Sequence, residues 1–78
     1  MLKVHVQLYS ILREKLPPAS KGQISLNLKE ESDLGDVLKE LGISSRVVIS
    51  VNGEHVSEIS YRLKNDDQVK IFSSVGGG

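Results

Sequence analysis

The N-terminal stretch of the chain alternates strictly between apolar and polar residues. The apolar residues share one side of an extended backbone: Leu2, Val4, Val6 and Leu8. This two-residue period predicts a strand over residues 2–9 with one buried face and one face in contact with solvent. Ser10 can then cap a short helix over residues 11–16. That helix must end before Pro17, because a residue that precedes proline avoids helical backbone geometry.

The middle of the chain changes from the strand period to the helical period. After a turn at Gly22, alternate apolar residues predict a second strand: Ile24, Leu26 and Leu28. Residues 33–43 predict a helix whose apolar residues form one stripe at helical spacing: Leu34, Val37, Leu38 and Leu41. Asp33 is the expected N-cap and Asp36 adds negative charge to the first turn. Gly42 is expected to end the helix.

The last third of the chain predicts three more strands. A strand over residues 47–51 is followed by Asn52-Gly53, the strongest short signal for a hairpin turn, so that residues 54–56 return along it. Leu63 is expected to lie under a local turn made by three polar residues: Asn65, Asp66 and Asp67. The final strand has alternating residues that point inward and outward in turn: Val69 and Ile71 inward, Lys70 and Phe72 outward.

These elements predict an α+β fold in which one main helix packs across one face of a single mixed sheet. The helix cannot bury its apolar stripe alone, and the apolar faces of the strands offer the matching layer. The first and last strands can lie side by side in the middle of this sheet. Their solvent-facing sides carry Tyr9 and Phe72, which are two of only three aromatic residues in the chain.

Length, charge and composition exclude several classes of protein. A chain of 78 residues has room for one domain, and it contains no cysteine for disulfides, thiolate metal ligands or a cysteine nucleophile. Ten basic and ten acidic residues cancel, whereas nucleic-acid binding usually shows a positive excess. The apolar runs are too short to span a bilayer, and the alternating N-terminus is unlike a signal peptide. We therefore expect a soluble, cytoplasmic protein with no nucleic-acid or membrane partner.

No catalytic or metal-binding pattern is present in the sequence. His5 and His55 stand alone on strands, and no serine lies in a nucleophile elbow. Asp33 with Asp36 is explained by helix capping, and Asp66-Asp67 by a turn. The sequence predicts no active site and no metal, so that any role in chemistry is that of a substrate or carrier.

The C-terminal glycines are the remaining candidate. The sequence divides into a domain over residues 1–75 and a tail over residues 76–78, which has no side chains and can pass through a narrow channel in a partner. Ordering these residues costs roughly 1–2 kcal/mol each, so a docking surface elsewhere must offset that cost. The outward-facing Tyr9 and Phe72 are the candidate surface. A frayed end without a role is the alternative.

Four segments of the chain resemble a known family in their order and spacing: VQLYSILREKL, DLGDVLKELG, VVISVNGEHV and LKNDDQVKIFSSVGGG. Together they cover nearly the whole chain, which resembles the ubiquitin-like β-grasp sulfur carriers and most closely the small subunit of molybdopterin synthase. Two features depart from that family. Residues 65–69 lack the glycine of its turn, and Ser73-Ser74 replaces its proline pair, which implies a more flexible segment before the tail.

The resemblance implies a cycle centred on the carboxylate of Gly78. An E1-like adenylyltransferase would use ATP and magnesium to make an acyl-adenylate, and a persulfide donor would convert it to a thiocarboxylate. The tail would then enter the large subunit of molybdopterin synthase and give its sulfur to a pterin precursor. Tyr9, Phe72 and Val75 would contact the partners, with Gly76 as a variable position and Gly77 next to the reacting residue. No cofactor would be bound permanently.

Three other functions remain open at this point. The protein could carry sulfur to a thiazole, a tRNA or an amino acid, and only the "LRE" helix favours the molybdopterin branch. It could be a ubiquitin-like modifier that forms an isopeptide bond between Gly78 and a lysine. It could also be a β-grasp adapter with an inert tail. The first two share their activation chemistry, so the glycine tail does not distinguish them.

Overall fold

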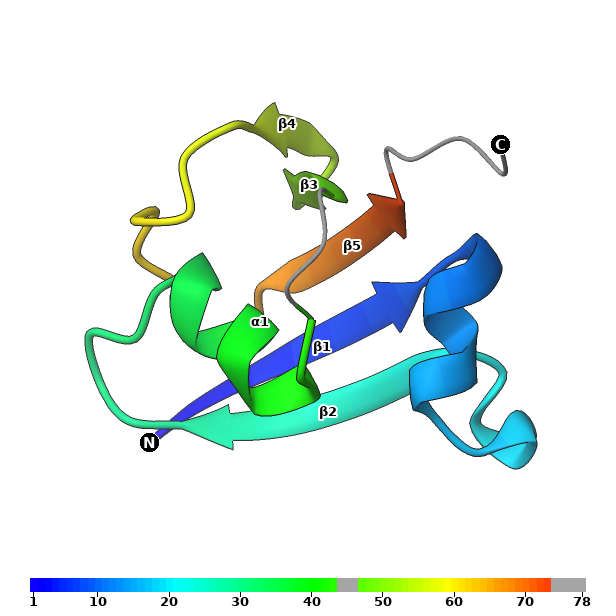
Figure 1. Ribbon diagram of the computed structural model, residues 1–78. Helices are drawn as coiled ribbons and strands as arrows, with labels where there is room; N and C mark the ends of the chain where they lie inside the picture. Colours follow the sequence, from blue (N-terminus) through cyan, green and yellow to red (C-terminus); the bar gives the residue numbers. More distant parts are fainter. Residues whose placement is uncertain (44–46, 74–78) are drawn as a thin grey trace.

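The computed structural model describes residues 1–43 and 47–73. Its elements follow one another in the order β1 (Leu2–Leu8), the 3-10 helices η1 (Ser10–Lys15) and η2 (Pro18–Ser20), β2 (Gln23–Leu28), α1 (Leu34–Leu41), β3 (Val47–Val51), β4 (Glu54–Val56) and β5 (Gln68–Ser73). Figure 1 shows α1 crossing one face of the sheet and η1 beside the end of β1.

The five strands form one mixed sheet in the order β2-β1-β5-β3-β4. The two central strands, β1 and β5, run parallel, and every other neighbouring pair is antiparallel. The prediction that the first and last strands lie side by side in the middle is confirmed. One sheet with one main helix on a single face is the ubiquitin-like β-grasp, an α+β fold, as predicted.

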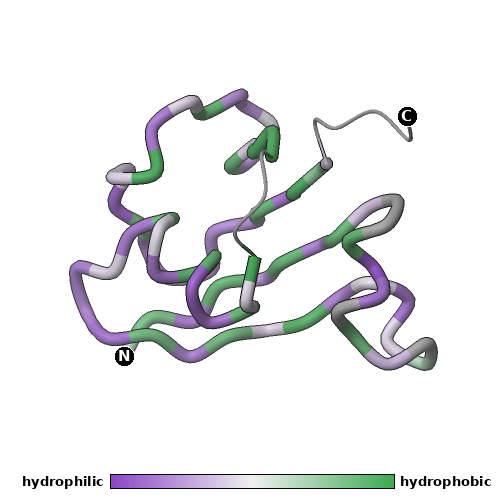
Figure 2. The backbone as a smooth tube through the Cα atoms, viewed as in Figure 1, coloured by the Kyte–Doolittle hydropathy of each residue, from purple (hydrophilic) through white to green (hydrophobic). Residues whose placement is uncertain are grey.

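The core lies between the sheet and α1. The strands contribute their alternate apolar residues, and α1 contributes Leu34 and Val37, both with no exposed area. Hydrophobic and hydrophilic segments accordingly alternate along β1 and β2 in Figure 2. Leu38 and Leu41, the other two residues of the predicted stripe, are partly buried against this core. The two-residue and helical periods therefore identify the buried residues correctly.

Both ends of α1 are fixed as the sequence predicts. The Asp36 backbone N–H donates to Asp33 Oδ1 at 3.0 Å, and the Asp33 N–H donates to Asp36 Oδ2 at 3.0 Å, which makes a reciprocal capping box. Gly42 follows the helix with φ +69°, and its N–H donates to carbonyls of the last turn. A helix of eight residues is too short to be stable alone, so these caps and its buried face hold it.

Two turns need backbone conformations that glycine and asparagine adopt easily. Asn52 (φ +52°) and Gly53 (φ +86°) form the two-residue hairpin turn between β3 and β4, as predicted. Gly22 has φ +78°, and a Cβ at this position would lie 2.6 Å from the carbonyl oxygen of Leu8. Any side chain at Gly22 would therefore clash with the end of β1.

The segment between β1 and β2 differs from the prediction. The predicted cap at Ser10 is wrong, because η1 begins at Ser10 and Tyr9 occupies the N-cap position without a side-chain hydrogen bond. The helix is of the 3-10 type and ends before Pro17, in agreement with the proline rule. The second 3-10 helix, η2, was not expected, because a proline pair and three small or polar residues give no periodic signal.

Within residues 1–43 and 47–73, no helix is long and apolar enough to cross a membrane. The predicted boundary between a domain over residues 1–75 and a tail over residues 76–78 lies outside the described residues, and it stays a prediction.

Candidate functional site

Of the six residues predicted to act in partner recognition or chemistry, the structure describes two. Tyr9 lies directly after β1, and Phe72 lies near the end of β5. The other four lie outside the described residues: Val75, Gly76, Gly77 and Gly78. Ser74 also lies outside the described residues; it is the second serine of the pair that stands where the family has two prolines.

Tyr9 and Phe72 form an aromatic stack on the face of the sheet opposite α1. Their ring centroids are 4.3 Å apart, and the ring planes differ by 9°. The parallel pairing of β1 with β5 produces this contact, since Leu8 is level with Ile71 and the Tyr9 N–H donates to the Ile71 carbonyl at 3.1 Å. Phe72 is 39% exposed and Tyr9 is half-buried. The prediction that both aromatics face away from the core is confirmed.

A third apolar side chain extends this surface onto the next strand. Val48 of β3 is paired with Phe72 and is 40% exposed. We refer to Tyr9, Val48 and Phe72 as the apolar surface. Three neighbouring apolar side chains on one sheet face, two of them exposed and one half-buried, are a feature typical of interaction sites. The surface lies at the C-terminal end of β5, immediately before the segment that leads to the glycines.

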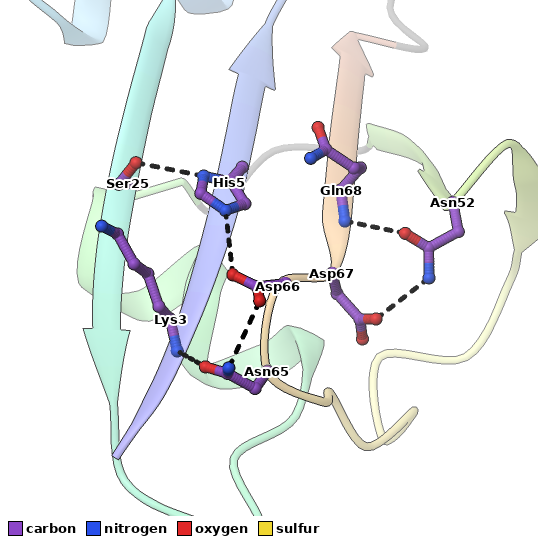
Figure 3. Close-up of polar contacts among 8 residues, drawn as sticks. All are labelled: Lys3, His5, Ser25, Asn52, Asn65, Asp66, Asp67 and Gln68. Atoms are coloured by element: carbon purple, nitrogen blue, oxygen red, sulfur yellow. Dashed lines mark hydrogen bonds and ion pairs between the residues drawn. The ribbon is translucent and has the colours of Figure 1, made fainter.

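The opposite end of β5 is held by polar contacts that involve a buried carboxylate (Figure 3). Asp67 is only 7% exposed, and its two oxygens accept from Asn52 Nδ2 at 2.9 Å and from the Lys64 N–H at 2.7 Å. Asn52 also accepts from the Gln68 N–H at 2.9 Å through its Oδ1 atom. These bonds connect the β3–β4 turn to the start of β5, and they give Asp66-Asp67 the turn role predicted for it.

The same region anchors the start of β1. The Lys3 N–H donates to Asn65 Oδ1 at 2.9 Å, and the Lys3 carbonyl accepts from the Asp66 N–H at 2.6 Å. The turn residues therefore bind both central strands at one end of the sheet.

His5 lies between a serine and an aspartate, an arrangement that the sequence did not reveal. Its Nδ1 is 3.3 Å from Ser25 Oγ, and its Nε2 is 3.4 Å from Asp66 Oδ1 (Figure 3). Both distances are long for hydrogen bonds, and the side chains of His5 and Asp66 are 36% and 72% exposed. An exposed, loosely connected serine of this kind is not an activated nucleophile. The described part of the chain also holds no cluster of three or more acidic, His or Cys side chains for a metal ion.

Comparison with known proteins places this geometry in a family. The model of the ThiS family matches residues 6–78, which is nearly the whole chain. The chain belongs to the ThiS family. A similar protein is the sulfur carrier protein TtuB of Thermus thermophilus, which is 28% identical over 53 residues, covering 68% of this chain and 82% of that protein.

Several solved structures share the fold of this chain. The putative molybdopterin converting factor subunit 1 of Pyrococcus furiosus superposes with a TM-score of 0.78 at 24% identity, over 96% of this chain and 100% of that one. The small archaeal modifier protein 1 of Haloferax volcanii gives 0.77 at 15% identity, over 96% and 100%. A chain in the complex of molybdopterin-converting factor subunits 1 and 2 from Helicobacter pylori gives 0.60 at 20%, over 99% and 100%.

The ThiS family match includes the apolar surface and all of the glycine tail. Sequence reasoning identified Tyr9 and Phe72 but missed Val48, although the signal was present. Because Ile49 and Val51 alternate toward the core, Val48 must face the other way, and an apolar residue in that phase marks the outer face.

Proposed function

We propose that this protein is a sulfur carrier that acts as the small subunit of molybdopterin synthase. The observation that carries the proposal is the ThiS family match, which extends through Gly77 and Gly78. The absence of cysteine from the sequence suits this role, since no internal thiol competes for sulfur carried at the terminus. The likeness to the Thermus thermophilus sulfur carrier supports the carrier role, and the fold shared with the Pyrococcus furiosus converting-factor subunit is compatible with the molybdopterin branch.

In the proposed cycle, the α-carboxylate of Gly78 is the reacting group. A carboxylate is a poor electrophile, so an E1-like enzyme uses ATP and magnesium to form an acyl-adenylate and release pyrophosphate. The outer sulfur of a persulfide attacks the acyl carbon, and AMP leaves. A thiol then reduces the resulting acyl disulfide and leaves a thiocarboxylate. The protein contributes a terminus narrow enough for the partner's site, because Gly76, Gly77 and Gly78 have no Cβ.

The apolar surface is the proposed docking site for the activating enzyme and for the large synthase subunit. Threading three glycines into a partner costs several kcal/mol of conformational entropy, which contacts elsewhere must offset. Phe72 is exposed and Tyr9 is half-buried, and both are aromatics of the type that dominates interface energies. The pairing of subunits 1 and 2 in the Helicobacter pylori complex supports a large-subunit partner for a chain of this fold.

The decisive experiment measures the intact mass of the protein after incubation with an E1-like enzyme, ATP, magnesium and a persulfide donor. We expect a mass increase that corresponds to one oxygen exchanged for sulfur, and none without ATP. The variant that lacks Gly78 should keep its circular-dichroism spectrum and show no increase. A full-length protein that stays unmodified with every activating enzyme tested would contradict the carrier function.

A second step tests the product. The thiocarboxylated protein is mixed with a large synthase subunit and a pterin precursor, and formation of the dithiolene is followed by fluorescence of its oxidised derivative. If the protein is loaded with sulfur but does not transfer it to the pterin, the carrier function stands and the molybdopterin pathway is contradicted.

The alternative function is that of a ubiquitin-like modifier, which the fold likeness to the Haloferax volcanii modifier protein favours. In that case Gly78 would form an isopeptide bond with lysines of other proteins. Mass spectrometry of tryptic digests from cells would then find lysines that carry the C-terminal residues of this chain.

A further inference from the structure

The outer face of the sheet carries positive charge beside the apolar surface. We propose that Lys70 directs this face to a partner protein whose docking site places a carboxylate next to an apolar pocket. The inference rests on the proposed function, because it concerns the partner that activates Gly78. The inference specifies the charge that the docking site of this partner must carry.

The strands divide the charges unequally between the two faces of the sheet. The outward positions hold two lysines and two histidines, and no acidic residue: Lys3, His5, His55 and Lys70. Glu54 is the single acidic residue in the five strands, and it is paired with Val51, whose side chain lies in the core. The other nine acidic residues lie on α1, on η1 and in the loops, and one of them, Asp66, contacts His5 at the edge of this face.

Lys70 lies at the centre of this face. Its neighbours across the two strand pairings are Gln7 and Ser50, which are both uncharged. Among the described residues, the ion pairs join Met1 to Glu30, His5 to Asp66 and Arg62 to Glu31, and none includes Lys70. Lys70 is exposed, so its ammonium group is free to meet a carboxylate from outside.

Lys70 is also close enough to the apolar surface to share its partner. Phe72 follows it by two residues on the same strand and the same face, which is a separation of about 7 Å along β5. A partner that covers Phe72 and Tyr9 therefore also covers Lys70. Burying an ammonium group without a counter-charge is costly, so the covering surface must supply a carboxylate.

An acidic protein surface fits this arrangement better than a nucleic acid. Nucleic-acid binding depends on several phosphate contacts from clustered Lys and Arg, whereas two lysines stand on this face and the chain is neutral overall. A charged side chain at the polar rim of an aromatic patch raises the association rate with a complementary protein surface and excludes wrong partners.

The test compares Lys70→Glu and Lys70→Ala with Lys39→Glu as the matched control. Lys39 is exposed on α1, on the opposite side of the sheet, so its reversal makes the same change in net charge. The measurement is ATP–pyrophosphate exchange by the E1-like enzyme of the same organism, with each variant as the carrier substrate. Thermal unfolding of each variant verifies the fold.

We expect Lys70→Glu to raise KM about tenfold at low ionic strength and Lys70→Ala to raise it about threefold, with kcat unchanged. At about 0.5 M salt the KM of Lys70→Glu should be only about twofold above that of the native protein. Lys39→Glu should leave KM within about twofold at both salt concentrations.

Three results would overturn the inference while exchange with the native protein continues. They are equal KM values for Lys70→Glu and Lys39→Glu, a Lys70 effect that salt does not reduce, and tight binding of a single-stranded oligonucleotide that Lys70→Glu abolishes. An absence of exchange with the native protein itself would instead contradict the proposed function. The two failures are therefore distinguishable.

Discussion

The two ends of β5 differ in what they hold and in what they leave exposed. At its start, Asp67 is buried and both of its oxygens accept hydrogen bonds from the protein. At its end, Phe72 is 39% exposed and stacks on Tyr9. One central strand therefore combines a polar end that fixes the fold with an apolar end that is available to a partner.

The difference follows from the cost of leaving each group without a partner. A buried carboxylate without donors would cost several kcal/mol, so the contacts of Asp67 must form whenever the chain is folded. An exposed aromatic ring loses only the benefit of burial, which a partner can still provide. Substitutions at the two ends should consequently separate stability from recognition.

The largest expected effect is on stability, for Asp67→Asn. Both groups that contact this side chain are donors, Asn52 Nδ2 and the Lys64 N–H, and an amide offers only one acceptor oxygen. Asn52 cannot turn its amide to compensate, because its Oδ1 already accepts from Gln68. We expect the free energy of unfolding in urea to fall by about 2–3 kcal/mol.

Asp66→Asn is the control for this prediction. Asp66 is the exposed neighbour in the same turn, and asparagine tolerates its left-handed backbone (φ +69°). The free energy of unfolding of Asp66→Asn should differ from that of the native protein by less than about 0.5 kcal/mol. Equal losses for the two variants would show that the buried contacts of Asp67 do not hold the turn. The KM of folded Asp67→Asn in nucleotide exchange should equal that of the native protein.

The next effect is on recognition, for Phe72→Ala. We expect the KM for the E1-like enzyme to rise about tenfold, because an exposed aromatic is the type of side chain that dominates interfaces. The free energy of unfolding should fall by only about 1 kcal/mol, the value of the lost ring stack. Exchange kinetics and urea unfolding measure the two quantities on the same samples.

Ile71→Val is the matched control for Phe72→Ala. Ile71 is the preceding residue and has no exposed area, so the loss of one methylene should cost about 1 kcal/mol of stability. Its KM should not change, since its side chain faces the core. If Ile71→Val raises KM as much as Phe72→Ala does, the apolar surface acts through stability and not through contact.

The sequence predicted the exposed apolar end of β5 better than its buried polar end. Alternation places Phe72 outward whichever strands lie beside it, and the hairpin signal at Asn52-Gly53 is local. The burial of Asp67 and its contact with Asn52 depend on pairing between residues 15 positions apart, which no local pattern encodes. The contact between His5 and Asp66, 61 positions apart, was hidden for the same reason.

The helix after β1 shows a different limit. Pro17 fixes where it ends, but its start depends on how Tyr9 continues the ladder to Ile71 before the backbone turns. That long-range bond moves the cap from Ser10 to Tyr9 and at the same time places the tyrosine ring against Phe72.

The smallest expected effect is for Tyr9→Leu, which keeps apolar area beside Phe72 but removes the stacked ring. Because Tyr9 is half-buried and leucine retains much of its contact area, stability should fall by about 0.5–1 kcal/mol. The KM for the E1-like enzyme should rise about threefold, less than for Phe72→Ala, since Phe72 remains in place. A KM above that of Phe72→Ala would mean that Tyr9, and not the more exposed Phe72, is the centre of the docking surface.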